Sequence, residues 1–227
     1  MNWQALRLSV ELALLTSVFL LLLLGIPLAH WIVLSKWRWK FLVEAVVALP
    51  IVLPPTVLGF YLLVAFGQNS PLGAFYESIA GTTLPFTFGG LLVASILYSL
   101  PFAVQPLATA FAGVNPRLVQ SSWVLGESRW RTFLRIVLPL SKSGIVTAFI
   151  LSFAHTLGEF GVVLMVGGNI PGVTRTLSID LYDQVQALNY RSAGETALFL
   201  LILSFFFLSI VTYMNRKRQG AEGGTER

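Results

Sequence analysis

Two ionisable residues lie four positions apart inside an apolar segment of the chain. At this spacing His155 and Glu159 would share one face of a helix, with Gly158 and Gly161 close by. An ionisable residue inside a membrane span usually faces the interior of a helix bundle and often serves function. The alternatives for Glu159 are an interhelical hydrogen bond or a place near the outer water boundary. We take Glu159 as a candidate pathway or gate residue.

Motifs for catalysis are missing from the sequence. There is no G-x-x-x-x-G-K-[ST] loop for nucleotide phosphates, no H-E-x-x-H, no G-x-S-x-G and no cluster of carboxylates for a metal ion. The chain also has no cysteine, which excludes disulfides and thiolate metal sites. We expect no enzyme activity, no cofactor and no metal in this chain, with a membrane enzyme as an alternative. If the chain moves a solute uphill, a partner must supply the energy.

The composition is typical of a membrane protein. Hydrophobic residues make up 56% of the 227 residues and charged residues 11%, and the mean hydropathy is +0.77. Apolar runs of about 20 residues predict an all-α integral membrane protein with about five transmembrane helices, five or six. They form one domain over 1–227. The spans are expected at about 8–34, 42–66, 88–112, 144–167 and 193–214.

The positions of Lys and Arg predict the orientation. With the N-terminus outside and the C-terminus inside, 36–40, the loop 113–143 and the tail 215–227 lie in the cytoplasm and hold 12 of the 15 basic residues. The remaining three lie outside: Arg7, Arg175 and Arg191. The first apolar run is too long for a signal-peptide core and shows no A-x-A site, so we expect a retained span. This pattern predicts the cytoplasmic (inner) membrane and argues against nucleic acid as a partner.

Adjacent prolines interrupt the second predicted span. Pro54 and Pro55 are followed by Thr56 and Gly59. Each proline removes a backbone donor and kinks the helix unless neighbours repair it. Broken helices line substrate paths in transporters, although membrane helices also tolerate proline without such a role. We take Pro54 and Pro55 as further candidate pathway or gate residues.

The segment 117–142 is too polar to cross a bilayer but has the pattern of a helix. Four apolar residues recur at i, i+3, i+4 and i+7: Trp130, Phe133, Leu134 and Val137. Gly126 falls between two short helical pieces, and Pro139 is expected to end the second piece. A basic amphipathic segment of this kind suits either anionic lipid or a soluble protein partner.

The spacing within this segment resembles the E-A-A-x3-G-x9-I-x-L-P signature of ABC importer permeases. The matching positions are Gln120, Ser121, Ser122, Gly126, Ile136, Leu138 and Pro139. Here Q-S-S replaces E-A-A, whereas the later residues stand at the expected intervals. The resemblance implies an ATPase-coupling loop that seats in a groove on a separate ATP-binding subunit. A salt bridge made by the missing glutamate has no counterpart in this chain.

Other segments are similar to oxyanion-importing permeases and together cover most of the chain. They are A-L-P-I-V-L-P-P-T-V-L-G at 48–59, L-G-E-F-G at 157–161 and G-N-I-P-G at 168–172. The run T-R-T-L-S-I-D-L-Y at 174–182 is similar to the molybdate branch, whereas 157–161 and 168–172 are shared with the sulfate branch. The resemblance implies the ABC type I importer permease fold and molybdate transport by alternating access. Tungstate or sulfate/thiosulfate is the alternative substrate, and a non-transporting scaffold is an alternative of another class.

The resemblance also implies partners. These are a second copy of the chain, two cytoplasmic ATP-binding subunits, an extracytoplasmic oxyanion-binding protein and the lipid bilayer. The binding protein would dock on the external loops, 68–86 and 168–192. Arg175 and Arg191 are candidates for docking or anion attraction, and the alternative is that they are solvated and balanced by Asp180 and Asp183. The segment 174–190 is expected to be an external amphipathic element or a re-entrant plug.

Overall fold

The computed structural model describes residues 1–223, with the side chains of residues 1–214 and of Arg216. Within this range the chain forms helices and no strand, which confirms the all-α expectation. The helical segments are α1 (Trp3–Phe19), the π-helical η1 (Leu20–Gly25), α2 (Ile26–Leu34), α3 (Lys40–Val52), α4 (Pro55–Phe66), α5 (Pro71–Ala80), α6 (Phe88–Tyr98), α7 (Leu100–Ala112), α8 (Pro116–Val124), α9 (Arg129–Thr132), the π-helical η2 (Phe133–Val137), α10 (Leu138–Leu140), α11 (Lys142–Gly158), α12 (Gly161–Gly167), α13 (Leu177–Gln186) and α14 (Tyr190–Gly223). Residues 224–227 of the predicted tail lie outside the described residues.

Two helices are long and apolar enough to cross a bilayer without a break. They are the continuous run Trp3–Leu34, made of α1, η1 and α2, and Tyr190–Met214 within α14. Three bent pairs pass the same test together: α3 with α4 (113°), α6 with α7 (42°), and Arg129–Leu140 with α11 (72°). If each bent pair is one span, the described residues hold up to five spans. The third pair covers 129–158 and differs from the predicted span 144–167, which corresponds to α11 and α12.

Prolines explain two of the bends. Leu53 precedes Pro54 and Pro55 and takes an extended backbone (ψ 135°), because the residue before a proline is pushed out of the helical region. Pro101 lies just after Ser99, where α6 gives way to α7. Proline is tolerated in the first turn of a helix, where its missing N–H has no intrahelical partner to lose. The expected kink at Pro54 and Pro55 is therefore a complete helix break, and a second break lies beside Pro101.

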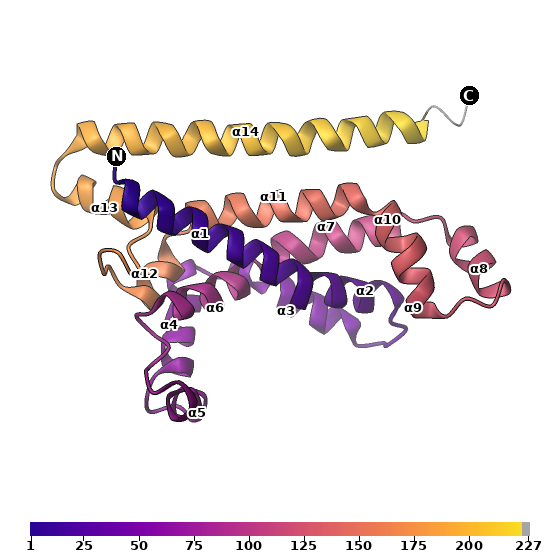
Figure 1. The fold of residues 1–227 in the computed structure, drawn as a ribbon, viewed down its shortest axis with the longest axis horizontal. Coiled ribbons are helices and arrows are strands. Elements are labelled where there is room, and N and C mark those ends of the chain that lie inside the picture. The colour runs from indigo at the N-terminus through magenta and orange to yellow at the C-terminus, as the bar shows by residue number, and fades with distance from the viewer. Residues whose placement is uncertain (224–227) are drawn as a thin grey trace.

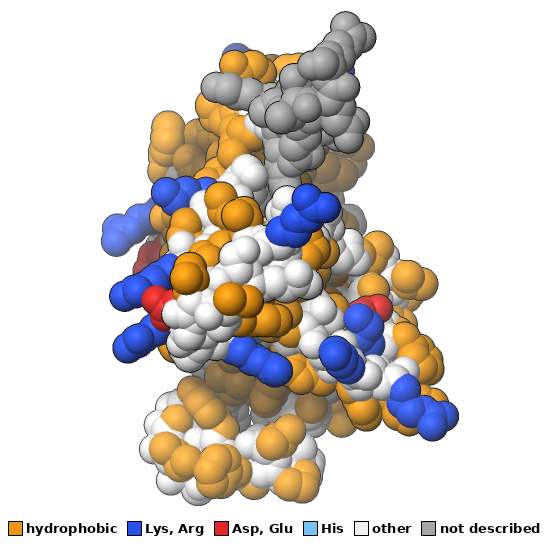
Figure 2. Space-filling model, turned by 90° about the vertical axis from the view of Figure 1, so that its right-hand side faces the viewer, with side chains coloured by type: hydrophobic (Ala, Val, Ile, Leu, Met, Phe, Trp, Pro, Cys, Tyr) orange, Lys and Arg blue, Asp and Glu red, His pale blue; other side chains and the backbone are white. Residues whose placement is uncertain are grey.

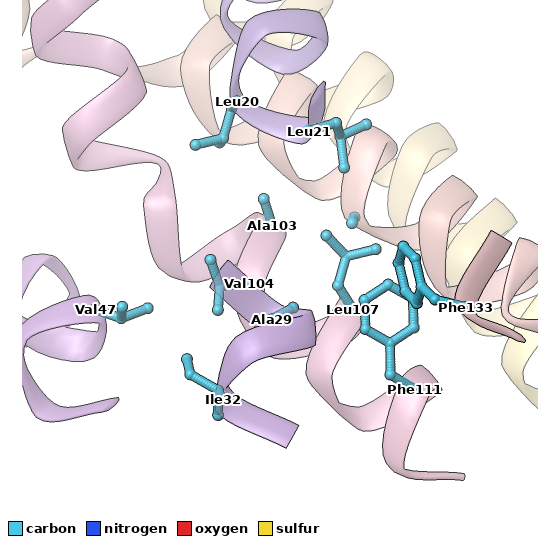
Figure 3. Close-up of a cluster of buried hydrophobic side chains, with 11 residues drawn as sticks. Leu20, Leu21, Ala29, Ile32, Val47, Ala103, Val104, Leu107, Phe111 and Phe133 are labelled. Carbon is cyan, nitrogen blue, oxygen red and sulfur yellow. The ribbon is translucent and has the colours of Figure 1, made fainter. Parts of the chain in front are cut away.

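The apolar core has two main parts, which lie on either side of these breaks. One part joins η1, α2, α3, α7, η2 and α11 around buried side chains such as Val104 and Leu107 (Figure 3). The other part joins α1, α6, α12 and α13 around Leu91 and Val163, with α4 packed alongside through Leu62. The two halves of each proline-broken pair thus contribute to different parts of the core.

The outer surface exposes apolar side chains along α14 and basic side chains at one end of the molecule. Helix α14 runs alongside α11 (Figure 1), and its apolar side chains Leu201, Ile202 and Phe205 are exposed. A bilayer would cover such a surface. Figure 2 shows the end formed by α8 and α9, where Lys and Arg side chains gather. This end carries the segment whose spacing suggested a coupling loop.

Candidate functional site

Helix α8 lies at the tip of the basic end of the molecule (Figure 1). It begins at Pro116, behind Asn115, whose side-chain oxygen accepts a hydrogen bond from the first turn of the helix. It ends in a turn at Gly126, where φ is +84° and favours glycine. There the N–H of Glu127 donates to the carbonyl of Ser122 (3.0 Å). Gly126 therefore separates two short helical pieces, as the sequence predicts.

A buried hydroxyl pair joins α8 to the helix after the turn. The hydroxyl of Ser122 donates to the Val119 carbonyl (2.8 Å), and its oxygen lies 2.8 Å from the hydroxyl oxygen of Thr132. Across the same turn, Glu127 pairs with Arg135 at 3.0 Å. These contacts hold α8, the turn and η2 together as one helix–turn–helix unit.

The Q-S-S triplet divides into exposed and buried positions. Gln120 and Ser121 are exposed, whereas Ser122 is buried between the two helices. Ser122, which stands in place of the second alanine of the signature, thus has a hydrogen-bond partner in Thr132. The departure from the signature leaves the packing of the loop intact.

The turn carries apolar side chains that are exposed in the described part of the chain. Val124 is 87% exposed and Leu125 is 83% exposed. Beside them Trp123 is also exposed, with the Arg129 guanidinium 5.9 Å from its ring centroid. Adjacent large apolar side chains exposed at the tip of a polar loop mark an interaction site, for a partner protein or for lipid. We call Trp123, Val124 and Leu125 the apolar tip.

The helix after the turn is anchored in the core by Phe133. This side chain is 2% exposed, and its ring lies 3.9 Å from the ring of His30 and 5.5 Å from that of Phe111 (Figure 3 shows both phenylalanines). Trp130 and Leu134, which belong to the same predicted stripe, are exposed. The stripe is therefore only half buried, and His30 is an aromatic packing partner.

The last residues of the signature lie on the run that leads into α11. Ile136 and Leu138 are half-buried, and Pro139 is exposed. The second helical piece ends at Leu140, one residue after Pro139, and the chain bends by 72° at Ser141. The hydroxyl of Ser141 donates to the Ala110 carbonyl of α7 at 3.3 Å, which fixes the bend against a neighbouring span.

Glu159 lies in the break between α11 and α12, so the expectation that it shares a helix face with His155 is wrong. Its backbone is extended (φ −64°, ψ 133°). Its side chain is 4% exposed, and within residues 1–214 neither carboxyl oxygen makes a hydrogen bond of good geometry, although the buried Ser95 hydroxyl lies close by. His155 instead lies 2.9 Å from the Ser99 hydroxyl and stacks on Phe102 at 4.0 Å. A buried polar group without a partner calls for an explanation in function or in a second conformation.

The break that holds Glu159 packs against α4. A Cβ at Gly161 would lie 2.7 Å from the Cβ of Pro55, and a Cβ at Gly59 would lie 2.6 Å from the Cβ of Met165. Small residues at such positions allow helix backbones to approach closely in membranes. The structure therefore packs Pro55, a candidate gate residue, against Gly161, two residues after the candidate Glu159.

The two outer arginines differ. Arg175 donates to the Asn169 side chain at 2.6 Å and pairs with Asp183 at 3.6 Å. The side chain of Arg191 is 92% exposed, with Glu195 4.0 Å away on the next turn of α14. The alternative of charge balance by Asp183 therefore holds for Arg175, and Arg191 is the solvated one.

The segment around α13 is fastened to the N-terminal helix. Asn2 donates to Asp180 at 2.7 Å, and the backbone N–H of Leu177 donates to the Ser9 hydroxyl at 2.7 Å. Leu177 and Ile179 are fully buried. Residues 174–180 are thus packed in the bundle, whereas 185–190 are exposed, and Asp180 binds Asn2 in place of an arginine.

Two polar residues were not predicted as candidates from the sequence. Gln105 and Thr109 are exposed side chains in the apolar helix α7. Their spacing of four was a usable signal, because it puts both on one helix face. Within the described residues no group of three His, Cys, Asp or Glu side chains is placed to hold a metal ion.

The fold is that of a membrane component of a transport system. The sequence model of the protein family 'binding-protein-dependent transport system inner membrane component' matches residues 21–220. The chain belongs to this family. It is a multi-pass protein of the inner membrane. It is 49% identical over 216 residues to the molybdenum transport system permease protein ModB of Azotobacter vinelandii, covering 95% of each chain.

Two further comparisons extend this likeness. The chain is 31% identical over 209 residues to the probable sulfate transport system permease protein cysT of Chlorokybus atmophyticus, covering 91% of this chain and 73% of the other. It superposes on a chain of the MetNI methionine ABC transporter, solved in inward facing conformations, with a TM-score of 0.71 and 16% identity. That superposition covers 95% of this chain and 94% of the other, and it supports the importer permease fold.

Proposed function

We propose that this chain is the membrane-spanning subunit of an ATP-driven ABC importer and forms the translocation path for molybdate. The observation that carries the proposal is 49% identity to a molybdenum permease along nearly the whole chain, against 31% to a sulfate permease. Tungstate, a close chemical analogue, and sulfate are the alternative substrates. The chain itself is not the enzyme, because ATP hydrolysis belongs to a separate subunit.

The basic end of the molecule is the cytoplasmic end in this proposal. Its Lys and Arg side chains agree with the positive-inside rule (Figure 2). Five spans then place the N-terminus outside and the C-terminus in the cytoplasm. Each of two ATP-binding subunits receives one coupling loop, and the apolar tip enters its groove. Burial of Val124 and Leu125 in that groove would remove apolar surface from water.

The importer works as a dimer of two such chains with an extracytoplasmic binding protein. The binding protein delivers the oxyanion to the outer face, near the loops 68–86 and 168–192. ATP binding draws the two ATPase subunits together and moves the helix–turn–helix units, so the spans alternate between outward-open and inward-open arrangements. A ligand drives such a change only through different affinity for the two states. Broken helices give the spans places at which to bend.

Reconstitution tests the proposal. The chain is assembled with its ATP-binding partner in proteoliposomes, and uptake of labelled molybdate, tungstate and sulfate is measured with the binding protein present. The expected result is ATP-dependent uptake of molybdate and tungstate in preference to sulfate. Preferential uptake of sulfate would overturn the substrate assignment and leave the importer class standing. Activity of the purified chain without any ATPase subunit would overturn the class itself.

A further inference from the structure

Helix α7 presents polar side chains where a membrane helix is expected to be apolar. Gln105 and Thr109 are exposed on one face of α7, in the half of the bent span nearer the basic end. A polar side chain within a span rarely faces lipid and usually faces the bundle interior or a water-filled cavity. Something other than lipid is therefore expected to lie against this face.

This face of α7 lines a groove of about 340 Å³ between α7, α11 and α14. Its polar lining residues are Gln105, Thr109 and Thr147, and none of its lining residues is charged. Thr147 is buried, and its hydroxyl has no hydrogen-bond partner among the residues whose side chains are described. Thr109, in contrast, already donates to the Gln105 carbonyl at 3.0 Å. The hydroxyl of Thr147 is itself covered, so the free donor that faces the groove is the amide of Gln105.

The floor of the groove is formed by a close helix crossing. A Cβ at Gly144 of α11 would overlap the Cβ of Ala110 on α7, and it would lie 3.3 Å from the Pro106 carbonyl. The crossing brings Thr147, one turn further along α11, beside the polar face of α7. Val211 of α14 lines the same groove. The polar groups are thus fixed on packed helices.

We propose that this groove is a wall of the water-filled path and that Gln105 offers hydrogen-bond donors to the oxyanion as it passes. The inference rests on the proposed function, which supplies the anion. Neutral donors suit a path, because conduction requires binding weak enough to release the ion. The groove also lacks a carboxylate that would repel an anion. Water fills the groove when no anion is present, since a space of this size holds several water molecules, each about 30 Å³.

The absence of cysteine from the chain makes the path directly testable. Single variants Gln105→Cys and Thr109→Cys are assembled with the partner subunits in membrane vesicles and treated with a charged, membrane-impermeant methanethiosulfonate reagent. Val146→Cys is the matched control, because Val146 is 42% exposed on α11, next to Thr147. Only a thiol in contact with water ionises and reacts. Gln105→Cys and Thr109→Cys are expected to react at least about tenfold faster than Val146→Cys.

Equal, slow labelling at all three positions overturns the proposal. If Gln105→Cys and Thr109→Cys form disulfides between two copies under mild oxidation but resist the charged reagent, the groove is a dry contact between subunits, which also overturns it. Labelling requires no substrate, so this result is independent of whether molybdate is the cargo.

A charge substitution tests the role of Gln105 itself. Gln105→Glu keeps the shape of the side chain but replaces donors by a negative charge, and Gln105→Asn keeps the donors. Oxyanion uptake is expected to fall about tenfold or more in Gln105→Glu and by much less in Gln105→Asn. Equal uptake by the two variants would overturn the donor role. If the wild-type complex transports no oxyanion while the labelling succeeds, the proposed function fails and the water-filled path stands.

Discussion

The hydroxyl of Thr132 donates a hydrogen bond to Ser122 at 2.8 Å, across the turn between α8 and the helix that follows it. Both side chains are buried, and the Ser122 hydroxyl already donates to the Val119 carbonyl. The pair fastens the helix that carries the apolar tip to the run that leads into α11. A displacement of the tip therefore moves both helices together.

Ser122→Ala is expected to loosen the coupling loop. The substitution leaves the Thr132 hydroxyl buried without its partner, which costs about 1–3 kcal/mol. We expect ATP hydrolysis by the assembled importer to continue while its stimulation by loaded binding protein falls. Ser121→Ala is the matched control, because Ser121 is exposed. Equal stimulation in the two variants would show that the hydroxyl pair plays no part in coupling.

Gly126→Ala is expected to impair uptake without preventing membrane insertion. The residue has φ +84°, and an L-residue in the left-handed region costs about 1–2 kcal/mol. Nothing lies within 4 Å of a Cβ placed there, so the effect comes from the backbone alone. Gly158→Ala is the control, since its Cβ also meets nothing and its φ is not positive. Uptake and membrane content of both variants are measured together.

Gly59→Ala is expected to separate α4 from α12. Its Cβ would lie 2.6 Å from that of Met165, and such overpacking costs about 1–3 kcal/mol. The thermal stability of the detergent-solubilised chain should fall, and the added change Met165→Gly should restore part of it by removing the opposing Cβ. Gly194→Ala, with open space around its Cβ, should leave stability nearly unchanged. A double variant no more stable than Gly59→Ala would contradict the contact.

Glu159→Met is expected to stabilise the observed conformation and to slow transport. The carboxyl group is buried without a partner here, and replacement of such a group by an apolar one removes a cost of about 1–3 kcal/mol. If the carboxyl finds its partner in the other transport state, the substitution shifts the chain towards the state described here. Thermal stability and molybdate uptake are the two measurements. A gain of stability with full uptake would show that Glu159 has no part in the cycle.

Arg175→Ala and Arg191→Ala are expected to behave differently. The first removes the contacts to Asn169 and Asp183 that hold the segment before α13, so stability and stimulation by the binding protein should both fall. The second removes a solvent-exposed charge, and surface ion pairs contribute about 0–1 kcal/mol. If Arg191→Ala alone weakens binding-protein stimulation, Arg191 is the docking residue and Arg175 is structural.

Local features were predictable from the sequence wherever backbone chemistry decides them. Gly126 lies between two short helical pieces in the sequence, which predicts a turn there, and its positive φ agrees. The break at Leu53 follows because the residue before a proline is pushed out of the helical region. In each case the physical cause lies within a few residues of the chain.

Features set by packing between distant segments were not predictable. The break at Glu159 lies beside the contact of Gly161 with Pro55, a residue about a hundred positions away, and spacing along the chain does not reveal such a contact. The pairing of Arg175 likewise depends on a fold that brings Asn169 and Asp183 to it. Exposure of Gln105 depends on where α11 and α14 leave a groove. The roles of these residues in transport stay predictions.

The bend at Ser141 sets the helix before it at an angle to α11, so that this helix can act as a lever arm. Residues 129–140 form an arm about 18 Å long that meets α11 at 72°. Its pivot is held by the hydrogen bond from Ser141 to α7. A movement of about 3 Å at the far end of such an arm turns it by about 10°. A small displacement of the loop by the ATPase would therefore rotate α11. This is the helix that ends beside the buried carboxyl of Glu159.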